Sequence, residues 1–326
     1  LQRPDMVAQA TRKRVEQAAE ALGYRPNIMA RGLRTRGSQS IGLIVTDILN
    51  PFQATLEKGV QNAAEDRGYT VLMFNSDEQP EKERRALDIL RGHLPRGLIV
   101  VSTSRTQENL AALPGLPVVE LDRSSGLPGA HTVMVDNVGG ARAAVRHLTG
   151  LGHRAIGMIV GRLDISTARE RLQGYREGLE EAGLPYRDEL VRPGNHRERD
   201  GREAARFLLS GPLSPGVGWP SALFVGNNEM TVGAVLAARE LGLQIPRDLS
   251  VVGFDDSRWA QTMSPALSVV AQPTYELGQL ACTRLLDLIE GRPLPPGARL
   301  PTTFIERQST APPTRAPPDR RPTPLL

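Results

Sequence analysis

The chain is poor in the groups that build disulfide scaffolds and membrane spans. Its 326 residues include a single cysteine, Cys282, so neither an intramolecular disulfide nor a cysteine-cluster metal site can form. No apolar run approaches the roughly 20 residues that cross a bilayer. The N-terminus also lacks the short apolar core of a signal peptide. These absences predict a cytoplasmic protein.

The sequence signatures of common enzymes are also missing. There is no Walker phosphate loop, no His-Glu-x-x-His pair and no Gly-x-Ser-x-Gly elbow. Gly150-Leu151-Gly152 resembles a dinucleotide loop only faintly, because it follows a predicted helix and precedes a predicted strand. The five histidines are scattered along the chain, at His93, His131, His147, His153 and His196. We therefore expect no enzyme, no cofactor and no metal.

Charge is distributed unevenly along the chain, whose net charge is +4. Residues 1–36 hold eight arginine or lysine residues against three acidic ones, whereas residues 37–311 carry a net charge of −3. A basic leading segment on a slightly acidic body indicates that one end holds a polyanion. A solvated basic helix face would give the same pattern, so charge alone leaves both interpretations open.

From residue 41 onward, short apolar runs rich in β-branched residues alternate with helical patterns. Such runs suit parallel strands that are covered on both faces. The series restarts near Ala155, after a long predicted helix at 139–151, which predicts two similar α/β lobes with doubly wound parallel sheets. The expected strands are 41–45, 70–74, 97–101, 117–121, 156–160, 222–225 and 249–253.

Several predicted helices have recognisable ends. Residues 8–22 show a helical apolar spacing, and a second helix begins where Asn50 can cap it and Pro51 can occupy its first turn. Further helices are expected at 167–182 and 231–241.

Polar side chains follow several predicted strands, at the edge where ligands bind in open α/β sheets. Asp47 follows the first strand, with Phe52 close behind; Asn227 and Asp255 follow two later strands. Each residue alone is typical of a helix cap or a turn. Their recurrence favours a site that exchanges hydrogen bonds with a hydroxyl-rich ligand.

Two groups of segments resemble one family of bacterial transcription regulators. Residues 11–15, 22–27 and 30–33 are similar to the third helix and the hinge helix in the DNA-binding domain of the lactose-repressor (LacI/GalR) family. The resemblance covers residues 4–311, in order and at the family's spacing. Its effector core is matched by residues 40–45, 50–52, 135–137, 148–153, 169–175, 250–256, 265–272 and 307–311.

The resemblance implies a type I periplasmic-binding-protein-like body: two lobes joined by three crossovers, with an effector bound between them. We expect a disordered tail at 312–326, where proline and arginine replace any hydrophobic pattern. The implied divisions are a headpiece remnant at 1–25, a hinge helix and linker at 26–38, an N-terminal lobe at 39–138 plus 274–302, and a C-terminal lobe at 139–273 plus 303–311.

The resemblance also implies the residues that contact the effector. A guanidinium such as Arg171 offers a rigid fork of donors, although a helix-surface salt bridge is its alternative role. Asp255 would accept hydrogen bonds from vicinal hydroxyls. His196 stands where several relatives place an aromatic ring. The implied effector-binding set is Asp47, Phe52, Asp136, Thr167, Arg171, His196, Asn227, Asp255 and Gln272.

For the hinge, the resemblance implies contacts with DNA. Leu33 matches the family's minor-groove wedge, an apolar side chain that unstacks and kinks DNA; a simple packing contact is the alternative. Arg31 and Arg34 would meet phosphates or the narrowed groove. Asn27 and Ala30 complete the expected DNA-binding hinge.

The family's DNA-binding domain begins with two helices before the position of residue 4, and this sequence lacks them. We therefore expect the chain as given not to bind a specific operator by itself. The resemblance implies an effector-responsive, sequence-specific DNA-binding regulator, in particular a repressor, that acts as a homodimer with operator DNA and a carbohydrate effector. The alternative is a periplasmic or extracellular sugar-binding protein, which would need a signal sequence and would not need residues 11–33.

Overall fold

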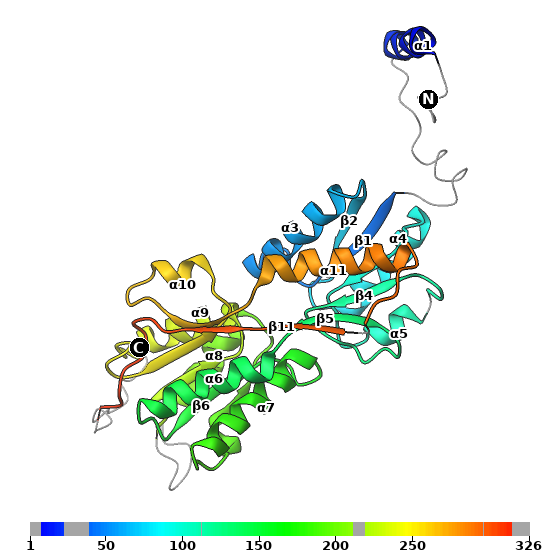
Figure 1. The fold of residues 1–326 in the computed structure, drawn as a ribbon. Helices are drawn as coiled ribbons and strands as arrows, with labels where there is room; N and C mark the ends of the chain where they lie inside the picture. Colours follow the sequence, from blue (N-terminus) through cyan, green and yellow to red (C-terminus); the bar gives the residue numbers. More distant parts are fainter. Residues whose placement is uncertain (1–7, 23–38, 112, 211–218, 296, 315–326) are drawn as a thin grey trace.

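The computed structural model describes residues 8–22, 39–111, 113–210, 219–295 and 297–314. They form a helix α1 (Gln9–Ala21) and two lobes, each built on a six-stranded sheet with helices on both faces (Figure 1). The predicted architecture of two doubly wound lobes is confirmed. The predicted hinge residues Asn27, Ala30, Arg31, Leu33 and Arg34, together with the tail from residue 315, lie outside the described residues.

The first sheet has the strand order β11-β5-β4-β3-β1-β2, and all of its pairs are parallel. Helices α3 (Pro51–Glu65) and α11 (Thr274–Ile289) cover one face, and α4 (Pro80–His93) and α5 (Thr106–Leu110) cover the other. The strands are β1 (Ser40–Val45), β2 (Thr70–Asn75), β3 (Leu98–Val100), β4 (Val118–Leu121), β5 (His131–Val135) and β11 (Gly297–Leu300).

The second sheet has the order β12-β10-β9-β8-β6-β7 and is parallel except that β12 runs antiparallel to β10. Its strands are β6 (Ile156–Val160), β7 (Val191–Pro193), β8 (Ala222–Val225), β9 (Ser250–Phe254), β10 (Ser268–Ala271) and β12 (Thr303–Ile305). Its helices are α6 (Asn137–Gly150), α7 (Ser166–Glu181), α8 (Glu198–Leu209), α9 (Asn228–Glu240) and α10 (Arg258–Thr262), with a 3₁₀ turn at Asp188–Leu190.

The chain crosses between the two sheets three times: from β5 to α6, from β10 to α11, and from β11 to β12. Each crossing spans no more than a few residues. Among the described residues, no helix is long and apolar enough to cross a membrane. The second and third crossings return the chain to a lobe it had already left. Each lobe is therefore assembled from separated parts of the sequence.

Each predicted strand is present, within about two residues of its expected ends. Of the strands that the sequence did not reveal, β7, β11 and β12 lie at the edges of their sheets, where the apolar pattern is weaker. The predicted helix at 8–22 forms as α1, but Val15 and Leu22 of its apolar spacing are exposed.

Helices α3 and α11 pack closely because glycines replace side chains at their contact. A Cβ atom on Gly278 would lie 2.1 Å from the Leu56 carbonyl oxygen, and one on Gly59 would lie 2.2 Å from the Tyr275 carbonyl oxygen. Real Cβ atoms do not approach backbone oxygens so closely. The two helices can therefore keep this spacing only while both positions lack a side chain.

We predict that Gly278→Ala lowers the free energy of unfolding by about 1–3 kcal/mol, because overpacking outweighs the helix preference of alanine. Gly92→Ala is the matched control: Gly92 also lies in a helix, but a Cβ atom there would meet no neighbouring element within 4 Å. That substitution should raise stability by up to about 1 kcal/mol. Urea unfolding measures both, and equal effects would contradict the close-packing explanation.

Candidate functional site

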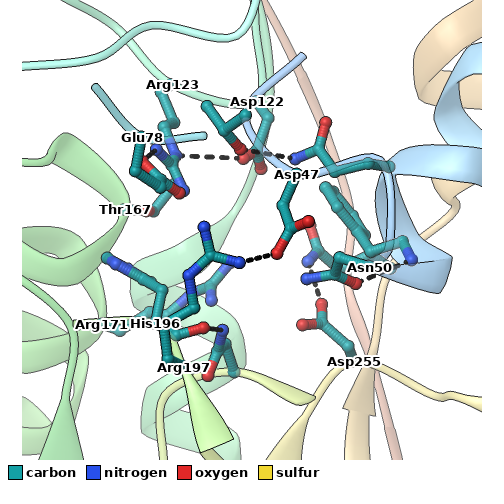
Figure 2. A pocket seen from close by; sticks show the side chains of 15 residues that line it. Asp47, Asn50, Glu78, Asp122, Arg123, Thr167, Arg171, His196, Arg197 and Asp255 are labelled. Atoms are coloured by element: carbon teal, nitrogen blue, oxygen red, sulfur yellow. Dashed lines mark hydrogen bonds and ion pairs between the residues drawn. The ribbon is translucent and has the colours of Figure 1, made fainter. Parts of the chain in front are cut away.

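Side chains from both lobes meet in one pocket at the carboxyl ends of the two sheets (Figure 2). The first lobe contributes residues that follow β1, β2 and β4 and the start of α3; the second contributes residues that follow β7, β8, β9 and β10 and the start of α7. The lining residues are Thr46, Asp47, Asn50, Phe52, Gln53, Glu78, Asp122, Arg123, Thr167, Arg171, His196, Arg197, Asn227, Asp255 and Gln272.

The pocket contains most of the residues expected from the sequence. Asp47, Phe52, Thr167, Arg171, His196, Asn227, Asp255 and Gln272 all line it. Asp136 does not: it is exposed and caps α6, with its carboxylate accepting a hydrogen bond of 2.8 Å from the Gly139 amide. Asp136 therefore lies outside the pocket lining in this structure, and the effector contact that the resemblance implies for it stays a prediction.

Four charged lining residues were not anticipated. Glu78 follows β2, and Asp122 and Arg123 directly follow β4, so the rule that found Asp47 would have found them had it been applied to the runs at 70–74 and 117–121. Arg197 follows β7, whose sequence Val191–Pro193 has no apolar run to mark it as a strand.

Arg171 is buried within the second lobe, with 5% of its surface exposed. Its Nε donates to Asn137 Oδ1 at 2.9 Å, a terminal nitrogen donates to the Gly226 carbonyl oxygen, and its guanidinium lies 3.7 Å from the centre of the Phe254 ring. Burial lowers the pKa of this guanidinium, against the attraction of Asp255 and Asp122. These contacts exclude the alternative of a helix-surface salt bridge.

Asp255 receives hydrogen bonds from two elements of its own lobe. Its carboxylate accepts from the Asn228 amide at 3.2 Å and from the side chain of Gln272. Burial raises the pKa of Asp255, and these bonds together with the charge of Arg171 only partly offset that effect. The neighbouring Asn227 caps α9 and also donates to the His196 carbonyl oxygen at 3.3 Å.

Glu78 and Arg123 form a buried ion pair in the first lobe. Both terminal nitrogens of Arg123 donate to the Glu78 carboxylate, at 2.7 and 2.8 Å. Burial by itself would raise the pKa of Glu78, but the charge and hydrogen bonds of Arg123 outweigh it and lower that pKa to about 2. Such a two-point pair fixes the guanidinium plane.

Burial shifts two further groups of the pocket strongly toward their neutral forms. It raises the pKa of Asp122 to about 6, although Arg123 and Arg171 favour its charged form. It lowers the pKa of His196 to about 3, and the positive charge of Arg123 adds to this effect. His196 is therefore neutral near pH 7, so it can donate a hydrogen bond through one ring nitrogen and accept through the other.

Four lining residues have left-handed backbones: φ is 61° at Glu78, 67° at Asp122, 59° at His196 and 81° at Asp255. Positive φ is uncommon outside glycine, although aspartate and histidine tolerate it better than most residues. Each such residue costs about 1–3 kcal/mol and persists where surrounding contacts fix it, often at ligand sites. The turn after each strand thus directs a polar side chain into the pocket.

Buried polar atoms without a hydrogen-bond partner concentrate in this pocket. Of the described buried side-chain atoms in this condition, five belong to its lining: Gln53 Oε1, Asp122 Oδ1, Arg123 Nε, His196 Nδ1 and Gln272 Oε1. Leaving a buried polar group unpaired costs about 1–3 kcal/mol. A polar ligand that pairs with these atoms would recover that cost, which marks the pocket as a binding site.

Contacts across the pocket join the two lobes. Arg197 forms an ion pair with Asp47, and Asn50 and Asn228 exchange side-chain hydrogen bonds of 3.2 and 2.8 Å. The free space that remains is about 30 Å³, room for no more than about two water molecules. A ligand of sugar size must therefore displace these cross-lobe contacts.

Together, the two lobes, the three crossings and the polar pocket define a periplasmic-binding-protein-like body. Residues 145–310 match the family model described as a periplasmic binding protein-like domain. Catabolite control protein A from Priestia megaterium is 33% identical over 312 residues, covering 93% of this chain and 91% of that protein. The chain belongs to the LacI/GalR family of transcriptional regulators, and it is related to regulators rather than to enzymes.

Solved structures agree with this assignment. The lac repressor dimer bound to operator and the anti-inducer ONPF is 28% identical, with a TM-score of 0.81 over 94% of this chain and 91% of that one. The complex of the transcriptional regulator CelR with cellobiose is 32% identical, with a TM-score of 0.76 over 94% and 92% of the two chains.

We predict that Asp122→Asn stabilises the protein at pH 8 by about 1–3 kcal/mol. The folded state binds the Asp122 proton more tightly than the unfolded chain, because burial raises the pKa of Asp122 from 3.8 to about 6. Wild-type stability is therefore lost as the pH rises through 6, whereas asparagine avoids this loss. Urea unfolding at pH 8 and pH 4 tests this: the advantage should fade at pH 4, and a constant difference would contradict it.

We also predict that Arg197→Ala lets the lobes separate, because it removes the charge that pairs with Asp47 across the pocket. Spin labels at Lys58→Cys on α3 and Arg239→Cys on α9 would report the distance between the lobes, and the buried Cys282 should escape labelling. The variant should give a longer or broader distance distribution than wild type. Arg197→Lys, which retains the charge, is the control; unchanged distances in Arg197→Ala would refute the role of this pair.

Proposed function

We propose that the chain is an effector-responsive, sequence-specific DNA-binding repressor that senses a small polar metabolite, a sugar or sugar derivative. The observation that carries this proposal is the pocket between the lobes, where polar side chains from both sheets converge and five buried atoms lack a hydrogen-bond partner. The basic segment 1–36 is proposed as the DNA-binding end, with residues 26–38 as hinge. The lobes divide at 39–138 plus 274–302 and 139–273 plus 303–311.

The chemistry of the pocket supports a hydroxyl-rich ligand over a flat aromatic one. Phe52 supplies the only aromatic side chain among the described lining residues besides the His196 ring, whereas carboxylates and amides supply many acceptors. Hydroxyls arranged around a sugar ring can donate to several such acceptors at once. One apolar face on Phe52 suits a pyranose ring, and the related CelR complex holds a sugar, cellobiose.

Thermodynamic linkage explains how effector binding would change the affinity for DNA. An effector that pairs with both lobes favours one arrangement of them, and the arrangement of a homodimer sets the spacing of its two DNA-binding ends. The rival proposal, an exported sugar-binding protein, would use the same body. It offers no role for the basic residues at the start of the chain, so the regulator is the stronger proposal.

We predict that, once the chain carries the first two helices of the family's DNA-binding domain, a sugar changes its affinity for its operator and Asp255→Ala abolishes this response. Duplexes selected from a random library would supply the operator, and fluorescence anisotropy with and without each sugar would measure affinity. Asp255→Ala should raise the dissociation constant of the sugar more than about tenfold, since a hydrogen bond to a buried charge contributes about 1.5–3 kcal/mol.

The exposed Asp88→Asn on α4 is the control and should respond like wild type. If the chain carrying the two added helices binds a sugar but selects no duplex, the exported binder is favoured instead. Selection of a duplex with no response to any sugar would refute sugar sensing but keep the DNA-binding role.

A further inference from the structure

We propose that the pocket selects an uncharged ligand rich in hydrogen-bond donors and rejects the phosphorylated or carboxylated forms of the same compound. This inference rests on the proposed function and narrows the class of effector. It follows from two features of the lining side chains: their balance of charge, and the kinds of polar atom that still lack partners.

Negative charge is in slight excess in the pocket. Above about pH 6, where the Asp122 carboxylate is ionised, four carboxylates face three guanidinium groups, which leaves one negative charge uncompensated. His196 adds no charge because burial holds its pKa at about 3. The carboxylates belong to Asp47, Glu78, Asp122 and Asp255, and the guanidinium groups to Arg123, Arg171 and Arg197. An anionic ligand would add to this excess.

Each guanidinium already has protein partners. Arg123 is held by the Glu78 carboxylate at two points, and Arg197 is paired with Asp47. Arg171 donates from two of its three nitrogens to an amide oxygen and a backbone carbonyl oxygen, and the nearby Asp255 and Asp122 carboxylates supply its counter-charge. A phosphate that took Arg123 or Arg197 would leave a carboxylate of the pocket without its counter-charge, and an unpaired charge shielded from water is strongly destabilising.

The unpaired atoms are mainly acceptors. Gln53 Oε1, Asp122 Oδ1 and Gln272 Oε1 can only accept at these oxygens, whereas Arg123 Nε is a donor and His196 Nδ1 can serve either way. A phosphate dianion offers no donors, so it cannot satisfy the three oxygens. Hydroxyl groups can both donate to those oxygens and accept from Arg123.

A thermal-shift screen of the full chain with matched pairs tests this rule. The pairs are ribose and ribose 5-phosphate, glucose and glucose 6-phosphate, glucose and glucuronate, and adenine and AMP, with inorganic phosphate added alone at constant ionic strength. A ligand specific to the folded state raises the melting temperature. We expect a neutral member to raise it and to bind at least about tenfold more tightly than its anionic partner, because like charges repel strongly in a pocket of low dielectric.

Each outcome decides between the proposals. The proposal that the pocket selects uncharged ligands is overturned if an anionic compound binds as well as its neutral partner. It is also overturned if inorganic phosphate alone raises the melting temperature. A shift with adenine alone, and not with AMP or any sugar, refutes sugar sensing while supporting the rule. A screen in which no neutral compound binds contradicts both.

Two variants test whether the pocket charges cause the preference for neutral over anionic ligands. Asp122→Asn removes one negative charge without changing the shape of the side chain, so the ratio of anionic to neutral dissociation constants should fall by about tenfold. Asp88→Asn removes the same charge from the exposed face of α4 and should leave that ratio unchanged. An equal ratio in both variants would show that the pocket charges do not determine selectivity.

Discussion

Neutralisation of charge in a pocket with little room for water determines how the two lobes can meet. Asp47 in the first lobe forms an ion pair with Arg197 in the second, and Glu78 forms an ion pair with Arg123 within the first lobe. Removing one partner of a buried pair such as Glu78 and Arg123 typically costs about 3–5 kcal/mol, because it leaves the other charge uncompensated. The Glu78–Arg123 pair stays within the first lobe when the lobes separate, whereas the Arg197–Asp47 pair must then be taken over by water or by a ligand.

Close packing of helices keeps each lobe rigid, so the ion pairs of the pocket act between two rigid bodies. Glycines let α3 and α11 approach to backbone contact, and Gly174 does the same where α7 meets α6, with a Cβ position 2.2 Å from the Val138 carbonyl oxygen. Packed interiors resist small deformations. Any relative motion of the lobes would then be concentrated in the three short crossings, because hinges absorb changes in backbone angles at a few residues between rigid parts.

The sequence predicted the parts of this site that follow from local pattern. Asp47 and Asp255 each come directly after an apolar run, so the strand-end rule located them without a structure. The effector contact of Asp136 was implied by the family resemblance alone, and in this structure Asp136 caps α6 outside the pocket lining. Arg197 left no signal, since β7 is too short and too polar to recognise, and its pairing with Asp47 joins residues 150 positions apart. Pairings of this kind depend on how two separately folded lobes face each other, which no local pattern encodes.

A chain of hydrogen bonds connects the pocket to residues beside the crossings. Arg171 donates to Asn137 Oδ1 at 2.9 Å, and Asn137, the first residue of α6, donates in turn to Glu170 Oε2 at 2.9 Å. Glu170 Oε1 accepts from Arg299 of β11 at 2.7 Å. Asn137 begins the element that follows the first crossing, and Arg299 lies just before the third. Hydrogen bonds thus connect Arg171 in the pocket to residues beside two of the three crossings between the lobes.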